Sequence, residues 1–233
     1  MAGQFGTEYA VDIVFCIDAT GSMVDIIEKT KSKAKELYPE LQGALIESGR
    51  NVSQIRVKVI MFRDFYFDKK HSFAQTEFLT LPEEINEYES FLNLIKAAGG
   101  GDEPENGLEA LAAAINSDWT MDGDKRRHII VMYTDASAHP LEKAQTMDDK
   151  IKKYYPENMP GSLIELIEMW NNPSSDSALT NLSQRLILFA PSHEIWDEVA
   201  ALCVNTIYKP SQAGNGLEEI EYKEIINCIV KSV

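Results

Sequence analysis

Residues 11–23 read VDIVFCIDATGSM, and this stretch decides the fold. It opens with a continuous apolar run, residues 13–17, which is typical of a strand that is buried on both faces of a parallel sheet. The run ends at Asp18, and a helical pattern begins after Ser22. Asp18, Thr20 and Ser22 are therefore expected on a loop between the carboxyl end of a central strand and the amino end of a helix. Open α/β sheets bind ligands at such loops.

Two interpretations of this loop are open. The carboxylate of Asp18 and the hydroxyls of Thr20 and Ser22 could converge on a small hard cation such as Mg²⁺. Alternatively, Asp18 caps the helix while the two hydroxyls bind loop amides. A carboxylate at the end of a buried strand needs a counter-charge, and this need favours the cation.

Composition limits the classes of protein that the chain can belong to. Its 233 residues are 44% hydrophobic, which predicts one α/β domain over residues 1–233 with a substantial core. The net charge of −15 argues against nucleic acid and anionic membranes as partners.

The cysteines and residues 1–10 indicate the cellular compartment in which the protein is expected. Cys16, Cys203 and Cys228 are scattered and odd in number, so we expect reduced, buried thiols. Residues 1–10 lack a signal-peptide pattern, and no apolar run is long enough to span a bilayer. These features predict a cytoplasmic protein.

Strands and helices alternate along the rest of the chain. Amphipathic helical patterns separate the apolar segments, and the pattern over residues 23–49 contains Pro39, which should kink or split that helix. The sequence predicts a Rossmann-like three-layer α/β sandwich, with a mainly parallel sheet, one antiparallel edge strand and helices on both faces. Further strands are expected at residues 55–62, 73–79 (the antiparallel edge), 129–133, 186–189 and 204–207.

More acidic loops follow the predicted strands. Residues 99–105 read GGGDEPE, and Thr134-Asp135 ends a second continuous apolar run. Arg63 and Asp64 end another strand, where a structural ion pair between them is favoured over a role in the site. Because parallel strands end at one edge of a sheet, these loops can lie beside Asp18.

Together, D-x-T-G-S at residues 18–22, the glycine-rich turn at 99–102 and T-D at 134–135 resemble the von Willebrand factor A (VWA) domain and its metal-ion-dependent adhesion site. The order of strands and helices agrees over nearly the whole chain. The resemblance implies that Thr20 and Ser22 are direct hydroxyl ligands of a metal. It also implies that Asp18 and Asp135 bind the metal directly or through water.

The glycine-rich loop departs from the commonest pattern of the family, because Asp102 stands where many relatives have a threonine. Either Asp102 replaces that threonine as a ligand, or Glu105 approaches from outside the ligand set. The metal is expected to be Mg²⁺, with Mn²⁺ or Ca²⁺ as alternatives. Arg63 and His139 are expected to support the ligands, His139 by a hydrogen bond to a nearby carboxylate.

The resemblance implies a binding module in which a partner's Asp or Glu completes the metal's coordination, and not an enzyme. A narrower resemblance, to bacterial stand-alone domains of tellurite-resistance-like systems, suggests a kinase or a phosphatase as partner. The main alternative is a Mg²⁺-dependent phosphohydrolase with Asp18 as nucleophile, although that pattern requires an acid where Thr20 stands. A scaffold whose metal only stabilises the fold is the third possibility.

Overall fold

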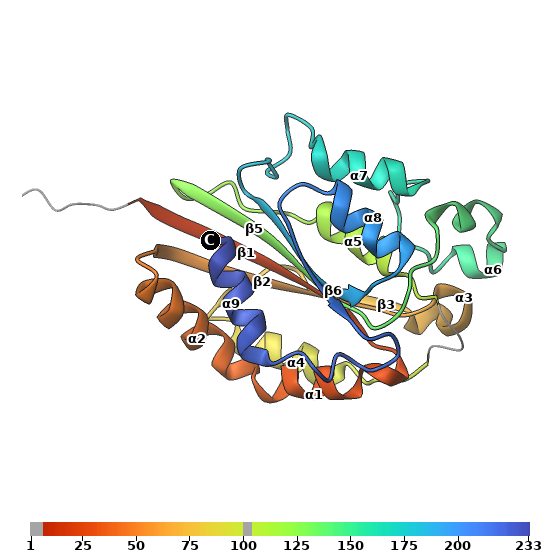
Figure 1. The fold of residues 1–233 in the computed structure, drawn as a ribbon, viewed down its shortest axis with the longest axis horizontal. Coiled ribbons are helices and arrows are strands. Elements are labelled where there is room, and N and C mark those ends of the chain that lie inside the picture. The colour runs from red at the N-terminus through yellow and green to blue at the C-terminus, as the bar shows by residue number, and fades with distance from the viewer. Residues whose placement is uncertain (1–6, 100–103) are drawn as a thin grey trace, which may run out of the picture.

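The fold is seen in a computed structural model that describes residues 7–99 and 104–233. These residues form a seven-stranded sheet in the order β3-β2-β1-β5-β6-β7, with β4 also pairing with β2 (Figure 1). The strands are β1 (Glu8–Asp18), β2 (Asn51–Phe62), β3 (Phe73–Gln75), β4 (Leu79–Leu81), β5 (Lys125–Tyr133), β6 (Gln184–Pro191) and β7 (Thr206–Ser211). The α-helices are α1 (Val24–Ser32), α2 (Ala34–Glu47), α3 (Phe65–Asp68), α4 (Ile85–Leu94), α5 (Gly107–Ile115), α6 (Asp149–Lys152), α7 (Leu163–Asn171), α8 (Glu194–Leu202) and α9 (Tyr222–Ser232), and short 3-10 turns lie at Gly21–Met23, Lys69–His71 and Leu141–Thr146.

The sheet lies between two layers of helices. Figure 1 shows α1, α2, α4 and α9 on one face and α5, α7 and α8 on the other. Alternate residues of β1 face the two layers: Ile13 and Phe15 belong to one core, and Val14 and Cys16 belong to the other. This burial on both faces explains why the strand reads as an unbroken apolar run. The predicted three-layer α/β sandwich is confirmed.

The antiparallel edge is divided in two. β1 pairs in parallel with β2 and β5, whereas β3 and β4 both run antiparallel to β2. β3 lies opposite residues 60–62 and β4 opposite residues 55–57, so the edge position is filled by two short strands instead of one. Between them the chain is held by Thr76, whose Oγ1 accepts a hydrogen bond of 3.0 Å from the backbone N–H of Val59.

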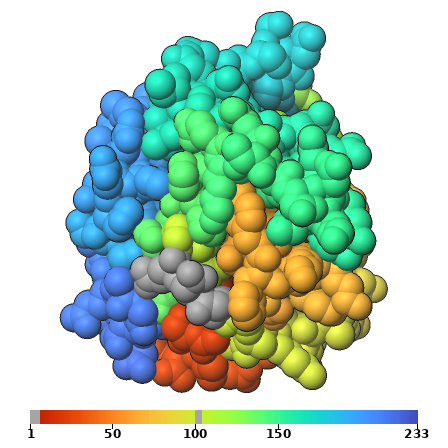
Figure 2. All heavy atoms as spheres, turned by 90° about the vertical axis from the view of Figure 1, so that its right-hand side faces the viewer, coloured from red at the N-terminus to blue at the C-terminus, as the bar shows by residue number. Residues whose placement is uncertain are grey.

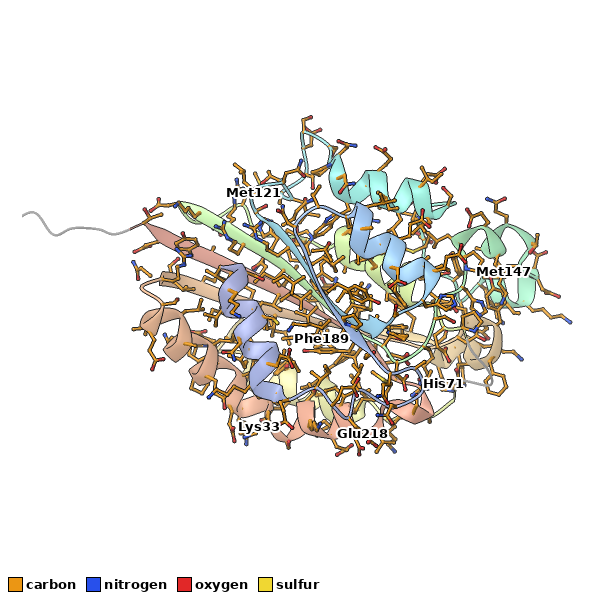
Figure 3. All side chains as sticks on the ribbon, viewed as in Figure 1. Lys33, His71, Met121, Met147, Phe189 and Glu218 are labelled. Atoms are coloured by element: carbon orange, nitrogen blue, oxygen red, sulfur yellow. The ribbon has the colours of Figure 1, made fainter. Side chains whose placement is uncertain are left out.

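The helix predicted over residues 23–49 is interrupted at Lys33, not at Pro39. Lys33 lies between α1 and α2 (Figure 3), and α2 continues through Pro39. Proline removes one hydrogen bond to the carbonyl four residues earlier. The helix persists because Leu37 and Leu41, on either side of the proline, are both buried in the core.

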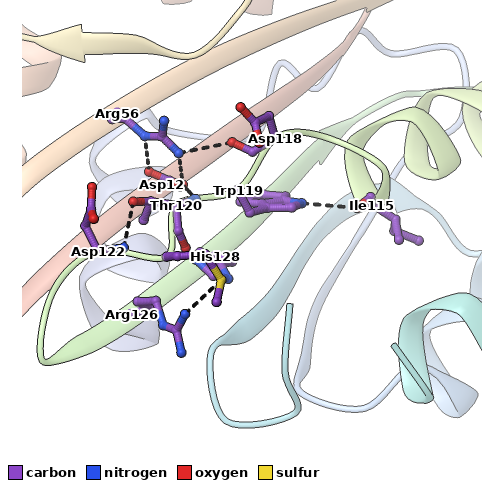
Figure 4. Close-up of polar contacts among 10 residues, drawn as sticks. Asp12, Arg56, Ile115, Asp118, Trp119, Thr120, Asp122, Arg126 and His128 are labelled. Carbon is purple, nitrogen blue, oxygen red and sulfur yellow. Dashed lines mark hydrogen bonds and ion pairs between the residues drawn. The ribbon is translucent and has the colours of Figure 1, made fainter. Parts of the chain in front are cut away.

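A buried ion pair fastens the other end of the sheet. The carboxylate of Asp12 accepts hydrogen bonds of 2.8 and 2.6 Å from Nε and an Nη of Arg56, and one of 2.7 Å from the backbone N–H of Thr120 (Figure 4). The carbonyl of Thr120 in turn lies 3.1 Å from Nε2 of His128. These bonds tie the loop between α5 and β5 to the first two strands.

The three cysteines are free and buried, as expected. In the part of the chain that the structure describes, no helix combines the length and the apolar character needed to cross a membrane.

Candidate metal-binding site

The candidate site lies at the point of the sheet where the order in which strands are added reverses direction. β1 is followed through α1 and α2 by β2 on one side, and β5 lies on the other side of β1. The carboxyl ends of β1 and β5 are therefore neighbours at a topological switch point, the usual ligand site of such sheets. Figure 2 looks onto this end of the molecule, where the early part of the chain (red), the sixties (orange), the middle (green) and the last part of the chain (blue) are all visible.

Asp18 is fully buried at the end of β1, and hydrogen bonds hold its carboxylate. Oδ1 accepts bonds from the backbone N–H and the hydroxyl of Thr20, at 2.9 and 2.6 Å. Oδ2 accepts a bond of 2.8 Å from the hydroxyl of Thr134, at the end of β5. Burial, with a smaller contribution from the charge of Asp135, raises the pKa of Asp18 to about 6 against the opposing effect of these hydrogen bonds.

Ser22 and Asp135 meet, although 113 residues separate them in the chain. The Ser22 hydroxyl donates a hydrogen bond of 2.9 Å to Oδ1 of Asp135. Oδ2 of the same carboxylate accepts a bond of 2.8 Å from the backbone N–H of Gly216. The backbone carbonyl of Asp135 also accepts a bond of 2.8 Å from Gly214. Three loops are thus joined at Asp135, and the predicted convergence of Asp18, Thr20, Ser22 and Asp135 is found.

Arg63 does not form the expected ion pair with Asp64. Its guanidinium donates to the backbone carbonyls of Ala19, His71 and Lys96, at 2.9, 3.3 and 2.6 Å. Three carbonyls that converge on one buried side chain satisfy the planar guanidinium, whose five donors suit several acceptors. Arg63 therefore fixes the loop after Asp18 against the segment that leads to the glycine-rich turn.

Asp64 performs a different structural role. It caps α3, because its carboxylate accepts a hydrogen bond of 2.7 Å from the backbone N–H of Tyr66. His139 lies beside it, with Nε2 at 3.6 Å from Oδ1 of Asp64. At this distance the predicted hydrogen bond of His139 to a carboxylate is not formed among the described residues; Asp64, and not Asp18 or Asp135, is the acid beside it, and Nζ of Lys143 lies 3.0 Å from its Nδ1.

Glu105 is 3% exposed and faces the site from the loop before α5. Its backbone is fixed by bonds of 2.9 Å to the carbonyl of Ser137 and 2.8 Å from the N–H of His139. Among the described residues, its Oε2 has no hydrogen-bond partner. Burial, followed by the charges of Asp18, Asp64, Asp68 and Asp135, raises the pKa of Glu105 to about 9. Asp102, the other acid predicted in this loop, lies outside the described residues.

One further buried acid escaped the sequence interpretation. Oε1 of Glu109, on α5, accepts bonds of 2.8 Å from the Asn106 amide and 2.9 Å from the Tyr155 hydroxyl. Burial raises the pKa of Glu109 to about 7. Asn106, the N-cap residue of α5, is a local partner three residues earlier, whereas Tyr155 is brought to this glutamate by tertiary packing.

The donor set has the chemistry that a hard divalent cation requires. Carboxylate and hydroxyl oxygens converge, and the buried Oε2 of Glu105 lacks a donor. None of Asp18, Glu105 and Asp135 forms an ion pair with another described residue, so no side-chain cation is present to stabilise these acids in their ionised form. The described residues include no group of three His, Cys, Asp or Glu side chains placed to hold a metal. A site here therefore needs hydroxyl ligands as well as acids.

No protein-family model matches the chain, and no curated protein matches it. Solved structures do match. One is the pilus adhesin SpaC from Lactobacillus rhamnosus GG, with a TM-score of 0.54, 13% identity, and cover of 98% of this chain and 31% of SpaC. Another is described as von Willebrand factor type A from Catenulispora acidiphila, with a TM-score of 0.51, 12% identity, and cover of 97% of this chain and 43% of that one.

The chain thus spans less than half the length of either of these proteins. At such low identity the likeness concerns the fold alone. The strand order, the two helical layers and these neighbours agree, and the chain has a VWA-like fold.

Proposed function

We propose that this chain is a divalent-metal-dependent protein-binding module that captures an acidic residue of a partner at the carboxyl end of β1 and β5. The observation that carries the proposal is the contact of 2.9 Å between the Ser22 hydroxyl and Oδ1 of Asp135. It joins the two loops that a metal ion would have to bridge.

Thr20, Ser22 and Asp135 would hold the ion, with Asp18 binding directly or through water and Asp102 as a further candidate. Mg²⁺ is the expected metal, and Mn²⁺ or Ca²⁺ would suit the same oxygen donors. When bound, the ion would supply positive charge and an open coordination position for a carboxylate of the partner.

The chain's own residues prepare this arrangement. The Thr20 hydroxyl donates a hydrogen bond to Asp18, which leaves the lone pairs of the hydroxyl oxygen free for a cation. Gly216 and Ser22 orient the two oxygens of Asp135. Without a cation, these acids would repel a partner's carboxylate, so the interaction is expected to require the metal.

The role we propose is binding and not catalysis, with a protein that presents Asp or Glu as partner, and with neither nucleic acid nor membrane. A kinase or a phosphatase is the narrower proposal for that partner. The free, buried cysteines support a cytoplasmic location.

The first test measures metal binding directly. Titration of Mg²⁺ and Mn²⁺ into the protein by calorimetry should show one site, and Ser22→Ala should weaken it about tenfold or more, since a direct ligand is lost. Ser32→Ala is the matched control, because Ser32 is an exposed serine at the end of α1 whose hydroxyl donates to the carbonyl of Lys29, away from the site. Equal affinities in the wild type and Ser22→Ala would contradict the proposed ligand set.

The second test measures partner binding. Proteins retained from cell extract by the wild type in Mg²⁺ should be lost in chelator and with Asp135→Asn, while Asp176→Asn, at an exposed position, should retain them. Retention that is unchanged in chelator would overturn the metal-dependent mode. Hydrolysis of generic phosphate esters that depends on Asp18 would instead favour the phosphohydrolase.

A further inference from the structure

A second site candidate lies away from the acidic edge, in a cavity of about 590 Å³ between β2, β3, α5 and the segment that precedes α7. Cavities of this size are typical of small-molecule sites. Phe73, Ala113, Met159 and Met169 form half-buried apolar walls, while Gln75, Asn116, Glu157 and Asn158 line it with exposed polar side chains.

Lys58 also lines this cavity, and it is only 6% exposed. Within the described residues, its Nζ forms neither a hydrogen bond nor an ion pair; the charges of Glu77 and Asp118 act on it only from beyond contact distance, and the ring centroid of Phe78 is 6.0 Å away. Lys58 is thus a cation at the wall of the cavity that no carboxylate of a described residue contacts directly. A carboxylate of a ligand in the cavity would supply such a contact.

The divided edge of the sheet explains why Lys58 opens onto a cavity. β3 ends its pairing at Ile60 and β4 ends its pairing at Val57, so Lys58 lies opposite the segment that joins the two short strands. A continuous edge strand would cover this stretch of β2. The opening is thus a consequence of the fold. A long hydrogen bond of 3.5 Å, from the Asn116 amide to the carbonyl of Asn158, links two walls of the cavity.

We propose that this cavity binds a small carboxylic acid with an apolar body, whose carboxylate pairs with the ammonium of Lys58. The single cation matches one negative charge, and the acid of Glu157 at the rim opposes a ligand of higher charge. The thioethers of Met159 and Met169 and the ring of Phe73 provide adaptable apolar contacts for the body of the ligand. The amides of Gln75 and Asn116 can donate to its polar atoms.

The test uses hexanoate as the probe and the side-chain methyl groups of Met159 and Met169 as reporters in NMR spectra. Hexanoate should shift both methyl signals in the wild type and should bind about tenfold more tightly than hexanol, because only the acid pairs with the lysine. Lys58→Met should abolish this preference, and Lys58→Arg should keep it. Lys70→Met, which removes an exposed lysine, is the matched control.

Two results would overturn the proposal: hexanoate that leaves the methionine signals unchanged, or equal binding of hexanoate and hexanol to the wild type. The second comparison needs no variant, so it decides the question even if Lys58→Met fails to fold. None of these residues belongs to the proposed metal site. The outcome of the hexanoate experiment therefore does not depend on whether Ser22→Ala weakens metal binding.

Discussion

At the scale of single residues, Gly216 shows how a distant loop completes the acidic edge. Its backbone N–H donates to Asp135, and its φ of +57° lies in the left-handed region that favours glycine. A Cβ at this position would lie 2.2 Å from the carbonyl oxygen of Ser22. Gly216 is therefore required for both its conformation and its close approach to the loop after β1.

Gly216→Ala should destabilise the protein and weaken metal binding, because the loop must move away from Ser22. Gly214→Ala is the matched control: Gly214 also has a positive φ, +69°, but a Cβ there would meet nothing within 4 Å. Gly214→Ala should lower the free energy of unfolding by about 1 kcal/mol, because of its backbone conformation alone. Gly216→Ala should lower it by about 1–3 kcal/mol more, because of the clash with Ser22. Chemical denaturation measures both values, and equal losses would show that the contact with Ser22 is unimportant.

The sequence predicts only some of the residues that make this edge. Asp18, Thr20, Ser22 and Asp135 could be identified because each follows directly on a buried strand, where the geometry of parallel sheets places loops together. Gly216 could not be, since the loop that carries it is brought there by the packing of the last helix. The burial of Glu109 is missed for a similar reason: Asn106 is a neighbour at the start of the same helix, but only the fold brings Tyr155 to it and covers it.

At the scale of elements, the buried pair of Asp12 and Arg56 joins β1 and β2 to the loop before β5. In the sequence, Asp12 is one polar residue next to an apolar run, and a buried acid at such a position requires a partner. Arg56 is its register neighbour on β2, so the pairing of the strands brings the two charges together. The pattern predicts the strands well, but the partner of a buried charge depends on the register, which the pattern alone does not fix.

Asp12→Asn should destabilise the fold by about 1–3 kcal/mol, because the half-buried guanidinium of Arg56 would lose its counter-ion while it keeps some contact with solvent and its bond to the carbonyl of Asp118. Asp122→Asn, an exposed acid in the same loop region, is the control and should change stability by less than about 0.5 kcal/mol. Thermal and chemical denaturation provide the measurement. The folded Asp12→Asn variant should keep its affinity for Mg²⁺, and a loss of metal binding would show that the two ends of the sheet are coupled.

At the scale of the whole molecule, 37 acidic and 22 basic residues give an excess of negative charge, part of which is buried at the candidate site. The pKa values of Asp18, Glu105 and Glu109 are raised to about 6, 9 and 7. Without a cation, this end of the sheet therefore holds protons at pH values where exposed carboxyl groups have lost them. The sequence predicts the acids at this edge, but not their protonation, which follows from burial and mutual repulsion.

The raised pKa of Glu109 should make the stability of the protein depend on pH. Because its pKa is about 7 in the folded protein and about 4.5 when unfolded, the folded state holds a proton that the unfolded state has lost between these values. Its contribution to stability is therefore complete below about pH 4.5 and is lost as the pH rises towards 7. His128 has the opposite effect on stability below its ordinary pKa, because burial lowers its pKa to about 4 in the folded protein. The dependence of wild-type stability on pH therefore does not isolate the contribution of Glu109.

Comparison with Glu109→Gln isolates it, because His128, Asp18 and Glu105 are common to both proteins. In chelator, the free energy of unfolding of the wild type should fall relative to that of Glu109→Gln by up to about 1.4 kcal/mol per pH unit between pH 5 and 6.5. The glutamine can still accept the bonds from Asn106 and Tyr155 through its carbonyl oxygen, and Glu198→Gln, at an exposed position of α8, controls for the removal of one charge. Parallel pH profiles for the wild type and Glu109→Gln would mean that Glu109 is ionised in the folded protein, and that the buried edge does not retain protons in the way its geometry predicts.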